Sequence, residues 1–144
     1  YKSCLDSLQA AILQFKLEHL ETFNKKRRKI ANLYNQLLAK IKQVKTPKEM
    51  NYAYHIYHLY VIECPKRNAL QQYLSQNGIK TQIHYPKPIH LQKPYLRQGY
   101  RRGDFPISEK KAKRILSLPI FPELKEKEIR YICQKIASFY SLFT

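Results

Sequence analysis

The hydrophobic pattern of the first 46 residues is the feature that most constrains the fold. Apolar side chains recur every three or four residues from Leu5 to Ile41, the spacing of one face of an α-helix. Pro47 ends the pattern, because the residue before a proline is disfavoured in the helical conformation. Ser3 and Asp6 match a capping box at its start. We therefore expect one long helix, or two nearly continuous ones, over residues 1–46.

Residues 47–144 alternate strand and helix patterns and predict a small α/β subdomain. Aromatic and β-branched runs predict strands at 54–64, 79–84 and 117–122. Helical periodicity predicts helices at 66–76, 108–116 and 124–139, with Ser108 capping the second and Asn77-Gly78 ending the first. The expected fold class is α/β (an α+β layer), with a long N-terminal helix and a small three-stranded sheet packed by helices. We expect residues 1–144 to form a single domain.

Composition excludes several classes of protein. With only three glycines, the chain has no Gly-rich phosphate-binding loop, and it has no run of about 18 apolar residues that would predict a membrane-spanning helix. The three cysteines are widely spaced and form no CxxC pair, which indicates reduced thiols and a cytoplasmic protein rather than a disulfide framework. Because the first residue is Tyr rather than Met, we expect a piece of a longer protein.

The net charge of +17 is concentrated in two stretches. Nine basic residues and no acids lie in 25–48, and six basic residues and no acids lie in 80–102. Such a charge attracts nucleic acids, phosphates and anionic lipid surfaces. The densest run, Lys25–Lys29, precedes apolar residues at helical spacing, so we favour the solvated face of an amphipathic helix. Neither zinc-finger spacing nor an RNA-binding aromatic motif accompanies it, and we expect no nucleic-acid or membrane partner.

Metal binding and nucleophilic catalysis are not predicted. His55 and His58 are three residues apart in a predicted strand, where they would point to opposite faces, so we expect no metal site there. No cysteine lies beside an evident oxyanion loop, and paired carboxylates are lacking. We therefore assign no catalytic residue.

The proline-rich segment over residues 83–95 carries the best candidate binding site. His84 ends a predicted strand and Tyr85 follows it, and prolines hold both at a low conformational entropy cost. His90 and Lys87 add an imidazole and an ammonium group, which suit a polar or phosphorylated ligand. From these residues alone, a ligand site and a proline-stiffened turn remain about equally good interpretations.

Five strings give the sequence a family resemblance. They are SCLDSLQAAILQFKLEHL, HIYHLYVI, GIKTQIHYPKPIHLQKPY, GDFPISEKKAKRILSLPIFPEL and a terminal helix. In this order and spacing the chain resembles the C-terminal portion of the DegT/DnrJ/StrS family of nucleotide-sugar aminotransferases. The resemblance implies the small C-terminal domain of a fold-type-I transferase that depends on pyridoxal 5′-phosphate (PLP).

That resemblance also implies a function. Such enzymes transfer an amino group, usually from glutamate, to a nucleotide-linked keto-sugar, and they act as homodimers. PLP is held mainly by the family's large N-terminal domain, which supplies the Schiff-base lysine and is absent here. We therefore expect the chain to be inactive alone and to serve polysaccharide or cell-surface sugar biosynthesis as part of a complete enzyme.

The same resemblance implies which residues reach the ligands. His84 and Tyr85 resemble residues beside the PLP–substrate adduct, and His90 and Tyr95 are weaker candidates for substrate binding. Lys2 stands where the family has an Asn that touches the PLP phosphate, and it could meet that phosphate as a point charge. Cys4 stands where the family has an Arg, whose forked guanidinium a thiol cannot replace.

Two other interpretations remain open. The replacements at Lys2 and Cys4 are compatible with a non-catalytic remnant that binds anions or nucleic acid through its basic stretches. Alternatively, apolar positions on the first helix could make the chain associate with itself.

Overall fold

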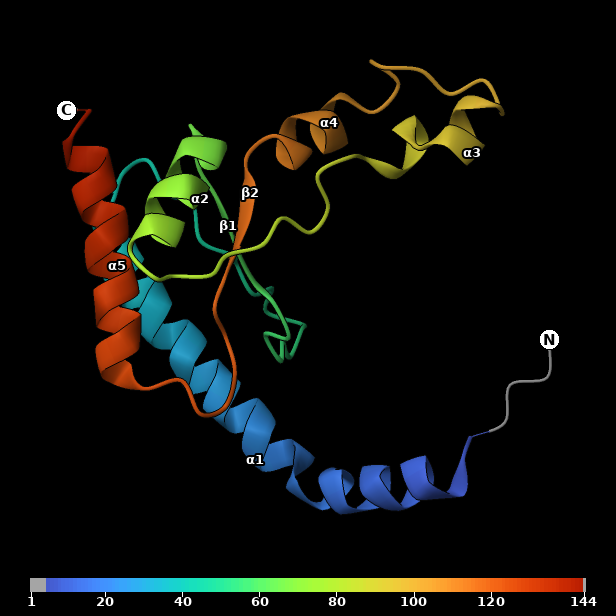
Figure 1. Ribbon diagram of the computed structural model, residues 1–144, viewed down its shortest axis with the longest axis vertical. Coiled ribbons are helices and arrows are strands. Elements are labelled where there is room, and N and C mark those ends of the chain that lie inside the picture. Colours follow the sequence, from blue (N-terminus) through green and yellow to red (C-terminus); the bar gives the residue numbers. More distant parts are fainter. Residues whose placement is uncertain (1–4, 144) are drawn as a thin grey trace.

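The computed structural model describes residues 5–143, and a single long helix dominates its first quarter. Helix α1 spans Ser7–Leu38 and projects well beyond the rest of the molecule at its N-terminal end (Figure 1). Asp6 is itself the N-cap, since its carboxylate accepts hydrogen bonds from the backbone N–H groups of Leu8 and Gln9. The capping box predicted from Ser3 falls partly outside the described residues, and Asp6 lies at the cap rather than inside the helix.

The two halves of α1 differ in burial. Leu8 and Phe15 are 71% and 64% exposed, whereas Tyr34 and Leu38 are fully buried. The helix ends at Leu38, so the prediction that it continues to residue 46 is wrong. The chain turns after Leu38, and Lys45 then exchanges backbone hydrogen bonds with Glu63.

The sheet has two strands within the described residues. Strand β1 (Tyr60–Glu63) pairs antiparallel with β2 (Ile115–Leu118), with Val61 opposite Ser117. Single bridges extend it on either side, from Lys45 to Glu63 and from Gln82 to Ser117. The prediction of three strands is therefore wrong. The segment predicted as a strand over residues 79–84 contributes a single bridge, at Gln82, before the proline-rich segment leaves the sheet.

Short and long helices surround this sheet. Helix α2 spans Arg67–Gln76, followed by the 3₁₀ turn η1 (Ile89–Leu91), the short α3 (Lys93–Leu96), α4 (Pro106–Ala112) and α5 (Glu126–Ser141). Helix α5 packs against both α1 and α2. The helix stop predicted at Asn77-Gly78 is confirmed, since Gly78 has a φ of 75° just beyond the end of α2.

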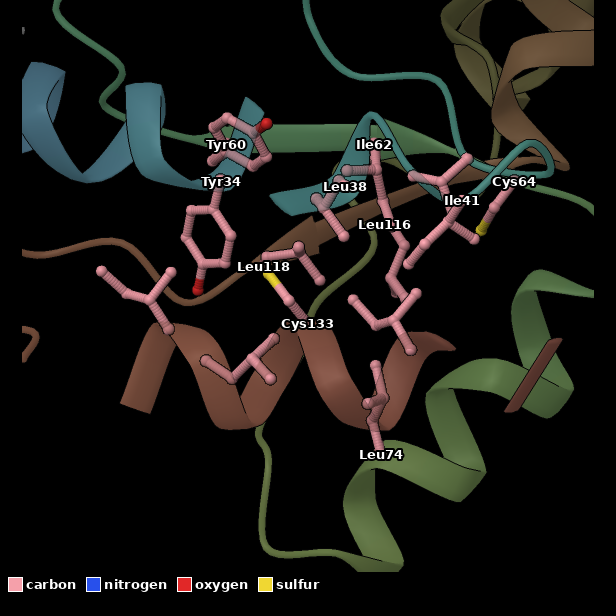
Figure 2. Packing of buried hydrophobic residues seen from close by; sticks show 14 of the residues in the cluster. Tyr34, Leu38, Ile41, Tyr60, Ile62, Cys64, Leu74, Leu116, Leu118 and Cys133 are labelled. Atoms are coloured by element: carbon pink, nitrogen blue, oxygen red, sulfur yellow. The ribbon is translucent and has the colours of Figure 1, made fainter. Parts of the chain in front are cut away.

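One hydrophobic core joins the second half of α1 to the sheet and α5. Figure 2 shows side chains from these elements converging, including Leu38, Tyr60, Leu116 and Cys133. The rings of Tyr34 and Tyr60 stack with centroids 4.8 Å apart. Burial raises the pKa of the Cys133 thiol to about 12, so that thiol stays protonated and inert. The mixed helix and small antiparallel sheet confirm the predicted fold class.

Candidate functional site

The proline-rich segment leaves the edge of the sheet and crosses toward α3 and α4 (Figure 1). Gln82 exchanges backbone hydrogen bonds with Ser117 of β2, at 3.2 and 2.8 Å, which fixes where the segment starts. Pro86 and Pro88 follow within a few residues and cannot donate backbone hydrogen bonds. Backbone pairing of this segment with β2 therefore ends at Gln82, two residues before His84.

His84 is anchored to the sheet. Its Nδ1 lies 2.9 Å from the Oγ of Ser117, a buried residue of β2. The His84 and Tyr85 rings lie edge to face with centroids 5.9 Å apart. His84 thus fixes the start of the loop from which Tyr85 projects.

Tyr85 lies at the mouth of a pocket between the proline-rich segment and α4. This pocket, the Tyr85 pocket, encloses about 500 Å³. Tyr85 is 74% exposed there. The full lining is Tyr85, Lys87, Pro88, Ile89, His90, Tyr95, Tyr100, Phe105, Ser108, Lys111, Ala112 and Ile115. The structure therefore brings together Tyr85, His90 and Tyr95, whereas His84 turns toward Ser117.

His90 forms a buried wall of this pocket. Its Nε2 lies 3.0 Å from Glu109 Oε1, and its ring centroid lies 4.9 Å from that of Phe105. Glu109 also accepts a 2.7 Å hydrogen bond from the backbone N–H of Gly103, which lowers the pKa of this carboxyl group. Because its Nε2 is committed to Glu109, His90 holds the loop to α4; contact with a substrate stays a prediction.

The lining from α4 and from the aromatic residues before it, Tyr100 and Phe105, was missed by the sequence prediction. Helix α4 begins at Pro106, with Phe105 as N-cap, and not with the predicted cap at Ser108. Pro at the first position of a helix is the signal that would have corrected the start. With that start, Ser108 and Lys111 lie three residues apart on one helical face, and both line the pocket.

The remaining sequence candidates lie elsewhere. Lys2 and Cys4 are outside the described residues, so the predicted cofactor contact at Lys2 stays a prediction. The strand predicted over 54–64 begins only at Tyr60, which leaves His55 and His58 in the preceding loop. There, His55 Nδ1 accepts a 2.8 Å hydrogen bond from the backbone N–H of Tyr57. Across residues 5–143 no helix is both long and apolar enough to cross a membrane.

Comparison with known proteins identifies the class to which this fold and pocket belong. Residues 1–137 match the DegT/DnrJ/EryC1/StrS aminotransferase family, and the chain belongs to that family. The chain is 48% identical to the pleiotropic regulatory protein of Geobacillus stearothermophilus over 145 residues, which cover 99% of this chain and 39% of that protein.

One further relative is named for its activity, and another has a solved structure. The dTDP-3-amino-3,6-dideoxy-alpha-D-galactopyranose transaminase of Aneurinibacillus thermoaerophilus is 39% identical over 93% of this chain and 36% of its own length. The crystal structure of DesV from S. venezuelae superposes with a TM-score of 0.90 at 31% identity, over 94% of this chain and 36% of that one. The chain thus spans well under half the length of these relatives.

Proposed function

We propose that this chain is the single C-terminal domain of a PLP-dependent aminotransferase that transfers an amino group from glutamate to a nucleotide-linked keto-sugar. In this proposal residues 1–46 and 47–144 act as one domain of a cytoplasmic homodimer that serves polysaccharide or cell-surface sugar biosynthesis. The observation that carries it is the Tyr85 pocket, built from the same segment that carries the family pattern. The relatives named as dTDP-sugar transaminases support the substrate class.

The described residues do not by themselves make a PLP site. Of the two lysines that line the Tyr85 pocket, Lys111 is ion-paired with Glu63 and Lys87 is exposed on the proline-rich turn. The nearby carboxylate, Glu109, accepts hydrogen bonds from His90 and from the backbone N–H of Gly103 through Oε1, so it fastens the loop to α4. We therefore propose that another part of the complete enzyme holds the cofactor and that this chain does not transaminate alone.

In this proposal the chain supplies one wall of the substrate site. The phenol of Tyr85 is a donor and acceptor on a loop that His84 ties to the sheet and His90 ties to α4. A group held this way can orient a sugar hydroxyl without moving during turnover. The aromatic rings of Tyr95, Tyr100 and Phe105 would exclude water on the far side.

A chimera tests the proposal. The C-terminal portion of the A. thermoaerophilus transaminase would be replaced by residues 1–144, and transamination would be followed with glutamate and the relative's own keto-sugar nucleotide. We expect an active chimera and no activity from the 144-residue chain with added PLP. In the chimera, Tyr85→Phe should lower kcat by about 10-fold to 100-fold, as loss of one positioning contact does.

Tyr131→Phe is the matched control, since this tyrosine lies on α5 outside the pocket. A monodisperse chimera that binds PLP but does not transaminate would contradict the proposal. The intact mass of the native protein gives an independent check: a mass well above 17.3 kDa would place both parts on one chain, and a mass near it would require a partner chain.

A further inference from the structure

A second concave site lies between α1 and the segment that leads into α5. Helices α1 and α5 pack against each other at the side of the sheet away from α3 (Figure 1). The groove between them, the α1–α5 groove, encloses about 690 Å³. It shares no lining residue with the Tyr85 pocket, and its volume falls in the range of small-molecule sites.

The rim of the α1–α5 groove carries uncompensated positive charge. Lys25, Lys26 and Lys29 lie within little more than one turn of α1, and all three are exposed. Among the described residues, none of the three ammonium groups has a hydrogen-bond or ion-pair partner. An anion could therefore bind there without displacing an existing partner.

Two carboxylates at this groove, Glu49 and Glu126, are held in ion pairs. Glu49 binds Arg28 at 2.6 Å and also accepts a hydrogen bond from the backbone N–H of His55. Glu126, which lines the groove, binds Arg130 at 2.6 Å. Among the described residues that line the groove, the charges without an ion-pair partner are consequently those of the three lysines.

The floor and one side of the groove are apolar and aromatic. Ile30 and Ile129 are 6% and 2% exposed and form the base together with Leu33 and Leu124. At the rim, the Arg28 guanidinium lies 4.1 Å from the ring centroid of Tyr54, which holds the ring in place while 61% of the residue stays exposed. An ordered, exposed ring beside an apolar floor suits a planar, partly apolar group.

We propose that the α1–α5 groove binds a phosphorylated small molecule with a planar or apolar body, of the nucleotide class. The phosphates would lie against the lysine rim, and the planar body would lie over the apolar floor beside Tyr54. A nucleic acid fits less well, because the other basic stretch, over residues 80–102, runs toward α3 on the opposite side of the sheet (Figure 1). The two stretches do not form one track for a phosphate backbone.

The test is a titration of the full 144-residue chain with ADP at physiological salt, by calorimetry and by amide chemical shifts. We expect saturable binding at one site, shifts that include residues 25–36, weaker binding of pyrophosphate and no binding of adenosine. Lys25→Gln/Lys29→Gln should weaken ADP binding by about ten-fold or more, since two charge-assisted contacts are lost.

Lys16→Gln/Lys40→Gln is the matched control, because it removes the same charge from exposed positions of α1 and its C-terminal turn outside the groove. Equal weakening by both double variants would overturn the proposal in favour of generic attraction. Equal affinity for pyrophosphate and ADP would overturn the proposal that the planar body of the ligand binds over the apolar floor. Absence of ADP binding, with or without binding of duplex DNA, would also overturn it. Each result is independent of transaminase activity.

Discussion

At the scale of single residues, two arginines of α1 join parts of the chain that lie far apart in sequence. Arg27 donates to the backbone carbonyl of Ile120 at 2.9 Å. Arg28 donates to the backbone carbonyl of His55 and to Glu49, both at 2.6 Å. These guanidinium groups thus hold the segments before β1 and after β2 against the helix. Their forked donors explain why lysine would not be equivalent at either position.

Glu63, at the end of β1, links the stability of the fold to pH. Its carboxylate is ion-paired with Lys111 and lies 3.1 Å from Arg114 Nε, and the Lys111 hydrogen bond above all lowers its pKa below the usual 4.5. A lowered pKa in the folded state stabilises the protein above pH 4.5, and this contribution is lost as the pH falls through the folded-state pKa. Glu63→Gln should therefore lower the free energy of unfolding by about 1 kcal/mol at pH 7.

The difference between Glu63→Gln and the parent should shrink toward zero when urea denaturation is repeated at progressively lower pH, below the usual carboxyl pKa. Glu123→Gln is the control, because Glu123 is exposed and forms no ion pair within the described residues. A stability difference that stays constant with pH would show that Glu63 acts through packing and not through its charge.

At the scale of elements, local pattern predicted the helices better than the strands and the site. Helix α2 and α5 were found because their apolar periodicity and the Asn77-Gly78 stop are local signals. The strand predicted over residues 79–84 is reduced to one bridge. A composition rich in strand-forming residues does not reveal that Gln82 alone pairs with β2. In the site, the sequence singled out His84 and His90, but their partners lie 33 and 19 residues further along the chain. Such long-range contacts carry no local signal.

Docking of α5 should contribute much of the stability. Ile136 of α5 is fully buried in the core, and the helix packs against α1 and α2. Ile136→Ala should lower the free energy of unfolding by about 2–5 kcal/mol, from lost apolar burial and the cavity left behind. Gln134→Ala, at an exposed position of the same helix, should change it by less than about 0.5 kcal/mol in the same urea titration. If Ile136→Ala and Gln134→Ala changed the free energy of unfolding by equally small amounts, α5 would not be packed into the core as described.

At the scale of the whole molecule, exposed apolar side chains are unevenly distributed. Among the described residues they concentrate in the first half of α1, in residues 50–59 and in residues 85–107. These three segments border the same open side of the molecule in Figure 1. Patches of this kind mark interaction surfaces in soluble proteins. Relatives that are more than twice as long have further chain with which to cover such a surface.

The first half of α1 should make the 144-residue chain associate with itself. Leu8, Ile12 and Phe15 lie on one helical face and are each about half exposed or more. A second copy can cover this face, so sedimentation of the chain should depend on its concentration. Replacing all three with glutamate should give a monomer and change the free energy of unfolding by less than about 0.5 kcal/mol, since these side chains do not touch the core.

The matched control places the same added charge on polar, exposed positions of α1, as Gln9→Glu/Gln14→Glu/Thr22→Glu. Because it leaves the apolar face intact, this variant should still associate, which separates loss of apolar contact from simple charge repulsion. Equal dissociation of both triple variants would assign the effect to charge. A parent chain that sediments as a monomer at every concentration would show that the apolar face of α1 does not pair with a second copy.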